Sequence, residues 1–171
     1  MSIELVFFLS FFTSTLAEAF IAGLWYPPYY RSGIPVFKKK LHFPLVLSTK
    51  LNIDRLDAEF QSGFTSSIVF REIGEDEYAF REAFLQIRFL SYTPLMHGHI
   101  LIEPRRGIVT VVGRLYWTVF SLAFIALWPA VWVLEIIPFL AVLLFTLYAI
   151  QVRRFNKVWV LVKTLLASTA D

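Results

Sequence analysis

The sequence predicts a membrane protein of the α+β class, in which about three transmembrane helices flank a small antiparallel β-rich domain with a short helix. Hydrophobic residues make up 57% of the 171 residues, whereas about 45–50% is usual in soluble domains. They are concentrated at the two ends of the chain, and basic residues flank both apolar blocks. The polar middle contains short runs typical of strands, separated by turn residues.

We expect four segments along the chain. They are an N-terminal transmembrane helix at 1–26, a cytoplasmic β-rich domain at 27–113, a transmembrane helical hairpin at 114–152 and an amphipathic C-terminal helix or tail at 153–171. The chain contains no cysteine, which excludes a disulfide framework, a thiol nucleophile and a cysteine metal site. We expect no cofactor.

The first apolar segment runs from about Ile3 to Trp25, which at roughly 1.5 Å per residue is long enough to span a membrane. The aromatic residues and prolines at 25–30 favour an interface and stop the helix. Ser10, Ser14 and Glu18 follow i, i+4 spacing and form a polar stripe. We interpret Glu18 as an intramembrane polar residue that marks a packing face or reaches the interface. The alternative is a proton or ion role.

A cleavable signal peptide is the other interpretation of this end of the chain. The tripeptide at 17–19 matches the small-x-small cleavage pattern. The start, however, carries Glu4 and neither Lys nor Arg, whereas a signal peptide needs positive charge there. We therefore expect a retained anchor.

The second apolar block, from Leu115 to Ile150, is too long for one untilted span. Pro129, Glu135 and Pro138 interrupt it with helix breakers and a charge. We expect two short spans, at about 115–131 and 137–152, joined by a turn. Glu135, near that turn, is the second intramembrane polar residue.

Charge placement predicts the orientation of these spans. Arg114 precedes the hairpin, Arg153 and Arg154 follow it, and Lys38–Lys40 follow the first span. Because positive charge favours the cytoplasmic side, the polar domain and the C-terminus are expected in the cytoplasm and the N-terminus outside. After the hairpin, apolar residues recur at helical spacing. This pattern fits either an interfacial amphipathic helix or a helix packed on the polar domain.

The polar domain is predicted to be an antiparallel meander of four to six strands with one helix. Strands are expected at 66–73, 78–89, 98–103 and 108–115, with another at 38–47. A turn is expected at 74–77, a hairpin connection at 104–107, and a short helix at 51–60.

The candidate metal ligands are His97, His99 and Glu103, which would share one face of an extended segment. Two histidines separated by one residue are common without a metal, so we favour polar loop histidines and no metal. A second set consists of basic residues expected at the membrane surface. Its members are Lys38, Lys39, Lys40, Arg105, Arg106, Arg114, Arg153, Arg154 and Lys157.

No catalytic motif is recognised, so the sequence favours a membrane-anchored binding or scaffold protein that presents its β-domain to a protein or lipid partner. The first alternative is a component of an oligomeric transporter or channel that uses Glu18 and Glu135. The second is a metal-dependent membrane enzyme that uses His97, His99 and Glu103. The expected partners are the lipid bilayer and a protein or a second copy of the chain, and not nucleic acid.

Overall fold

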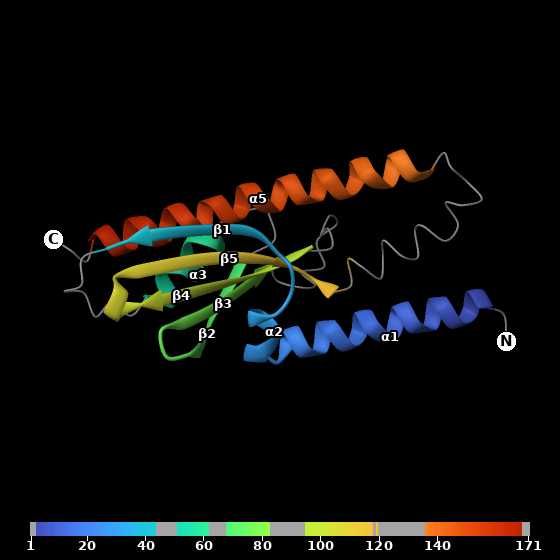
Figure 1. Ribbon diagram of the computed structural model, residues 1–171, viewed down its shortest axis with the longest axis horizontal. Helices are drawn as coiled ribbons and strands as arrows, with labels where there is room; N and C mark the ends of the chain where they lie inside the picture. Colours follow the sequence, from blue (N-terminus) through green and yellow to red (C-terminus); the bar gives the residue numbers. More distant parts are fainter. Residues whose placement is uncertain are drawn as a thin grey trace.

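The computed structural model describes residues 3–43, 51–61, 68–82, 95–117, 119 and 136–168. These residues form one antiparallel sheet with helices on both of its faces (Figure 1). The helices are α1 (Ile3–Gly23), α2 (Pro27–Arg31), α3 (Ile53–Gln61), the 3-10 turn η1 (Pro104–Arg106) and α5 (Ile136–Ser168). The strands are β1 (Pro35–His42), β2 (Ile68–Gly74), β3 (Glu77–Glu82), β4 (Met96–Glu103) and β5 (Ile108–Leu115).

The sheet has the strand order β1-β5-β4-β3-β2, and every neighbouring pair is antiparallel. Strands β2 to β5 therefore form a meander, and β1 returns to pair with β5. Strands β4 and β5 pair along their whole length, from Met96 opposite Leu115 to Glu103 opposite Ile108. They are joined by η1 and by Gly107, whose φ of 59° lies in the left-handed region that glycine adopts without steric cost.

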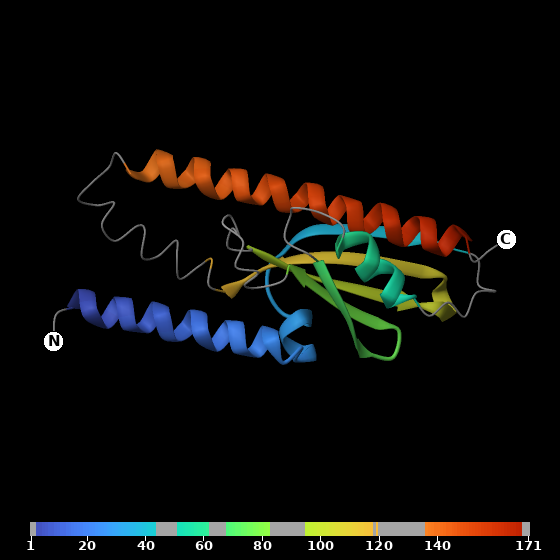
Figure 2. The ribbon, with the colours of Figure 1, turned by 180° about the vertical axis from the view of Figure 1, so that it is seen from behind.

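The sheet separates the core into two parts, and helices cover each of its faces. Helices α5 and α3 lie on one face, side by side in Figure 2, and α2 with the end of α1 lies on the other. Alternation along each strand sends successive side chains to opposite faces. Phe70, Phe80, Ile100 and Val111 therefore face α5 and α3, whereas Ala79 faces α2.

Two glycines let α5 and an aromatic ring approach the middle of the sheet. Gly98 and Gly113 lie opposite each other on β4 and β5. A Cβ atom on Gly98 would be 2.0 Å from Cζ of Phe80, and one on Gly113 would be 2.6 Å from Cδ2 of Phe155. The Phe80 and Phe155 rings pack with their centroids 4.9 Å apart. The glycines are thus required by the packing of the core.

The two edge strands are protected in different ways. Strand β1 carries Lys38, Lys39 and Lys40, all exposed, and charged side chains disfavour pairing with another strand. Strand β2 is flanked by α3, where Oδ1 of Asp57 accepts a hydrogen bond of 2.9 Å from the Phe70 backbone N–H. Burial raises the pKa of this Asp57 carboxyl.

The structure corrects the prediction of a membrane fold. Within the part of the chain that it describes, no helix is both long enough and apolar enough to span a membrane. The prediction of about three transmembrane helices is therefore wrong, and so is that of an integral, multi-pass protein with a cytoplasmic domain and C-terminus and an outside N-terminus. The observed class is α+β with a five-stranded antiparallel sheet.

Part of the apolar excess at the two ends of the chain fills the protein core. Ala22 and Trp25, at and just after the end of α1, are buried beneath the sheet. Phe155, Val158 and Val162 of α5 are buried against its other face. These apolar side chains, which raise the local hydropathy, are thus buried against other parts of the protein. Other large apolar side chains stay exposed on α1 and α5, among them Leu9, Phe12, Phe20, Phe139 and Phe145.

The structure from Ile136 onward also differs from the predicted hairpin and separate tail. From Ile136 to Ser168 the chain is one 33-residue helix, so the span expected at 137–152 and the amphipathic helix expected from 153 are continuous. Pro138 lies in the first turn of this helix, where a missing N–H breaks no hydrogen bond. The second half packs on the sheet, as one of the two interpretations of the amphipathic pattern expected. Residues 118 and 120–131 of the other expected span lie outside the described residues.

Candidate functional site

The candidate site is built where the chain reverses between α1 and α2. Helix α1 ends at Gly23. Trp25 has a backbone φ of 56°, a conformation that residues other than glycine rarely adopt. Pro27 and Pro28 then begin α2, since proline suits the first turn of a helix. This reversal buries Tyr29 and Tyr30 between α1 and the sheet.

Glu18 is the charged residue at the centre of this arrangement. It lies on α1, and the residue is only 6% exposed. Its Oε1 atom accepts a hydrogen bond of 2.6 Å from the Tyr29 hydroxyl and another of 2.6 Å from the Trp117 backbone N–H. These donors come from α2 and from the residues just after β5. The carboxylate therefore joins three parts of the chain that are distant in the sequence.

The Tyr29 hydroxyl is held as a hydrogen-bond donor. Burial, and then the hydrogen bond to Glu18, raise the pKa of this phenol above its ordinary value. Burial also raises the pKa of the neighbouring Tyr116 hydroxyl. Both phenols are protonated at neutral pH, so Tyr29 donates to the carboxylate rather than repelling it.

A cavity of about 480 Å³ opens beside this carboxylate, and we call it the Glu18 pocket. Its lining consists of Ser14, Ala17, Glu18, Ile21, Tyr26, Pro28, Tyr29, Ser32 and Trp117. Among these described lining residues, Glu18 is the single side chain with a formal charge. The Tyr26 residue is 55% exposed and Trp117 is 49% exposed, so their rings are partly open to solvent beside the buried carboxylate.

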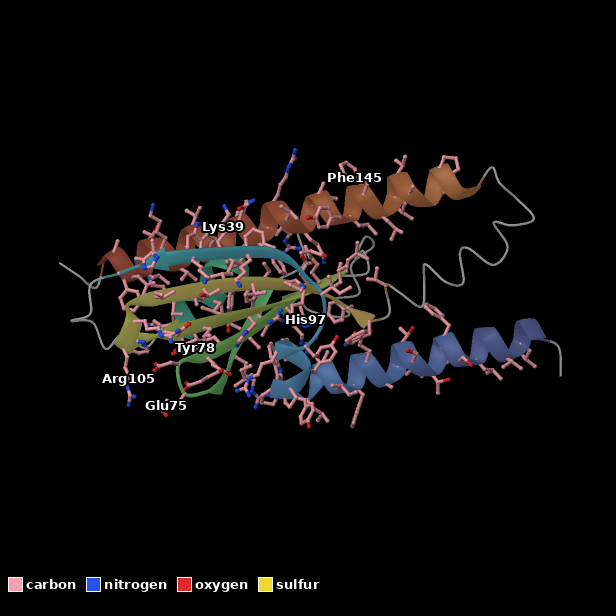
Figure 3. The ribbon with its side chains drawn as sticks, in the orientation of Figure 1. Lys39, Glu75, Tyr78, His97, Arg105 and Phe145 are labelled. Carbon is pink, nitrogen blue, oxygen red and sulfur yellow. The ribbon has the colours of Figure 1, made fainter. Side chains whose placement is uncertain are left out.

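His97 comes from β4 and lies between the sheet and α2 (Figure 3). Its ring stacks on Tyr29 with the centroids 4.7 Å apart and meets Tyr116 edge-on at 5.1 Å. Burial, followed by the charge of Arg114, lowers the pKa of His97 to about 3. Within the described residues, neither ring nitrogen has a hydrogen bond of ordinary geometry. The backbone of Tyr29 and Ser32 lies near the ring and raises its pKa, which offsets part of the effect of burial. His97 is therefore a neutral ring in an aromatic cluster.

The residues proposed as metal ligands do not gather at one site. Burial lowers the pKa of His99, whose Nε2 lies 3.8 Å from Oε2 of Glu77, and Arg31 binds the same carboxylate oxygen. Glu103 ends β4 and is paired with Arg106, with Nη1 and Oε2 3.1 Å apart. Among the described side chains, no three His, Cys, Asp or Glu lie close enough together to hold a metal ion.

The basic residues expected at a membrane surface are spread over several elements. Three of them lie on edge strand β1 and two in η1, and Figure 3 labels Lys39 and Arg105 from these two groups. Nε of Arg114 donates to the Tyr30 carbonyl at 3.2 Å. Arg154 forms an ion pair of 3.1 Å with the buried carboxylate of Glu82 on β3. The other two, Arg153 and Lys157, are exposed on α5. Glu135 lies outside the described residues.

Sequence reasoning singled out Glu18 but missed the residues that surround it. From the sequence, the run at 25–30 is expected to be an interfacial belt of aromatics with helix-breaking prolines. In the structure it supplies three lining residues, Tyr26, Pro28 and Tyr29, and the turn that positions them. The sequence feature that could have indicated the site is the short separation between Glu18 and this aromatic run, which is less than one helix length. Nothing in the sequence connected either to Trp117.

Comparison of the chain with protein-family models, with curated proteins and with solved structures finds no match.

Proposed function

We propose that this protein is a binding protein whose ligand site is the Glu18 pocket. The observation that carries the proposal is a buried carboxylate that is fixed by two hydrogen bonds in the wall of a cavity of about 480 Å³. Sites for small molecules are typically mostly apolar cavities of roughly 300–1,000 Å³ with a few precisely placed polar groups. The Glu18 pocket has this size and this distribution of groups.

The fixed geometry of the carboxylate supports recognition of a ligand. Tyr29 and Trp117 both donate to the same oxygen, so the fold orients the group before any ligand arrives. A site that is already ordered loses less conformational entropy on binding. The rings of Tyr30 and Trp25 are stacked with their centroids 5.5 Å apart, and this contact packs α2 against the residues that follow α1.

Filling the pocket tests the proposal. Ala17 lines the pocket from an exposed position of α1, so the Ala17→Phe substitution puts a larger side chain into the cavity and reduces its free volume without entering the core. Saturation-transfer NMR with small aromatic fragments of each charge type should detect binders to the unaltered chain. Ala17→Phe should weaken their binding by about tenfold or more, through lost cavity volume.

The matched control is Thr13→Phe, one turn earlier on α1, which is exposed and does not line the pocket. This variant should bind the fragments as the unaltered chain does. Equal binding by Ala17→Phe and Thr13→Phe would contradict the proposal, because the fragments would then occupy another surface. Circular dichroism of both variants verifies that the helices are retained.

The other functions expected from the sequence stay predictions. A scaffold role with a protein partner is compatible with a ligand pocket, since one protein can carry both. A transporter or channel role would require Glu18 and Glu135 to face one pathway, and Glu135 lies outside the described residues. The metal-dependent enzyme would require His97, His99 and Glu103 to converge, and among the described side chains no such group occurs.

A further inference from the structure

We infer that the Glu18 pocket selects an organic cation: a primary or substituted ammonium group attached to an apolar, aromatic-sized body. This inference rests on the proposed binding function and adds the chemical class of the ligand. The feature that assigns the class is the juxtaposition of one buried carboxylate with two partly exposed aromatic rings in the same cavity.

The charge of the lining favours a cation. Glu18 is the one formally charged side chain among the described lining residues, so a bound anion would face it without a compensating positive charge from that lining. An ammonium group gains both the Coulomb attraction and a charge-assisted hydrogen bond, about twice as strong as a neutral one. The carboxylate is 6% exposed as a residue, and screening by solvent is weaker for a buried charge.

The aromatic rings of the lining favour the same ligand. Tyr26 and Trp117 flank the pocket, and each is about half exposed. The face of an aromatic ring attracts a cation within about 6 Å of its centroid, and Trp attracts it most strongly. The same region already contains this interaction, because the Arg81 guanidinium lies 4.9 Å from the centroid of the Trp25 ring.

The remaining lining residues set the nature of the ligand body. Ala17, Ile21 and Pro28 present apolar surface, and Ser14 and Ser32 present hydroxyl groups. A cavity of about 480 Å³ exceeds the volume of a bare ammonium ion, so an apolar group is needed to fill it. The ligand class is therefore an amphipathic amine rather than an inorganic cation.

Three probes of similar size and different charge test the inference on the unaltered chain. They are 3-phenylpropylammonium, 3-phenylpropan-1-ol and 3-phenylpropanoate, and their affinities are measured by isothermal titration calorimetry at pH 7. The ammonium should bind at least about tenfold more tightly than the alcohol, and the carboxylate should bind most weakly. The comparison requires no substitution, so it stands even if a variant fails to fold.

Glu18→Gln assigns the preference to the carboxylate. The amide oxygen of Gln can accept the same two hydrogen bonds, so the substitution removes the charge and keeps the acceptor. The ammonium affinity should fall by about tenfold or more, and the preference for the ammonium over the alcohol should disappear. The control is Glu75→Gln, which makes the same charge change in the turn between β2 and β3, away from α1 (Figure 3).

The outcomes separate the two proposals. Binding of the alcohol or the carboxylate as tightly as the ammonium would overturn the choice of a cation and leave the binding function intact. An ammonium preference that survives in Glu18→Gln would also overturn the choice. If none of the three probes binds up to its solubility limit, the proposed binding function itself fails.

Discussion

The stability of the folded protein should fall steeply between pH 7 and pH 5 because His97 is buried as a neutral ring. The folded chain holds its pKa at about 3 through burial and the nearby charge of Arg114. In the unfolded chain the imidazole has its ordinary pKa of about 6.5. Below that pH the unfolded state therefore binds a proton that the folded state does not, and protons favour unfolding.

The size of the effect follows from the two pKa values. Each pH unit between about 6.5 and 3 removes about 1.4 kcal/mol of unfolding free energy from this one group. Between pH 7 and pH 5 the contribution of His97 is a loss of about 2 kcal/mol. The full loss of about 5 kcal/mol is reached near pH 3, and above pH 7 the dependence on His97 disappears.

Urea unfolding at pH 7, 6 and 5, followed by circular dichroism, measures this slope, and His97→Phe isolates it. The aromatic surroundings of Tyr29, Tyr30 and Tyr116 suit a phenyl ring. His99, whose pKa is also lowered by burial, acts in the same direction in both proteins and cancels in the difference. The reasoning is refuted if His97→Phe loses as much stability as the unaltered chain between pH 7 and 5. A shift of the His97 ring resonances in an NMR titration from pH 8 to pH 5 would refute it independently.

Two further predictions concern the packing of the sheet and of α5. Gly98→Ala should lower the unfolding free energy by about 1–3 kcal/mol, because the new methyl group meets the Phe80 ring, and thermal unfolding measures the loss. Combining it with Phe80→Leu should recover part of that loss, and an undiminished loss in the double variant would show that the ring is not the obstacle. Arg154→Met should cost about 3–5 kcal/mol, since it leaves the buried charge of Glu82 without this counter-charge. The double variant Glu82→Met/Arg154→Met should be more stable than Arg154→Met alone, and the reverse order would contradict the buried ion pair.

The positions of the strands followed from local sequence patterns. The strand predicted at 108–115 is β5, and those predicted at 98–103 and 66–73 correspond to β4 and β2 with shifts of a few residues. The helix expected at 51–60 is α3, Ile53–Gln61. Alternation and turn residues are properties of neighbouring residues, so they are visible without the fold. Residues 83–89 of the strand expected at 78–89 lie outside the described residues.

The membrane prediction failed because hydropathy records how apolar a segment is and not what buries it. The residues Phe155, Val158 and Val162 are apolar, and the surface that covers them is the sheet. Two glycines in β4 and β5 create the space for that contact, and a sequence pattern does not show which ring occupies it.

For the candidate site, the local pattern of residues is enough to predict that Glu18 lies on a polar stripe of a helix and is followed by an aromatic, proline-rich turn. The groups that this carboxylate contacts are visible only in the folded protein. Two groups that donate hydrogen bonds to it are the Tyr29 hydroxyl, 11 residues away, and the Trp117 backbone N–H, 99 residues away. Contacts at such separations depend on how the sheet and helices pack, because no local pattern brings the two segments together. The Glu18 pocket therefore forms only when the fold brings these segments together, and no local sequence pattern predicts it.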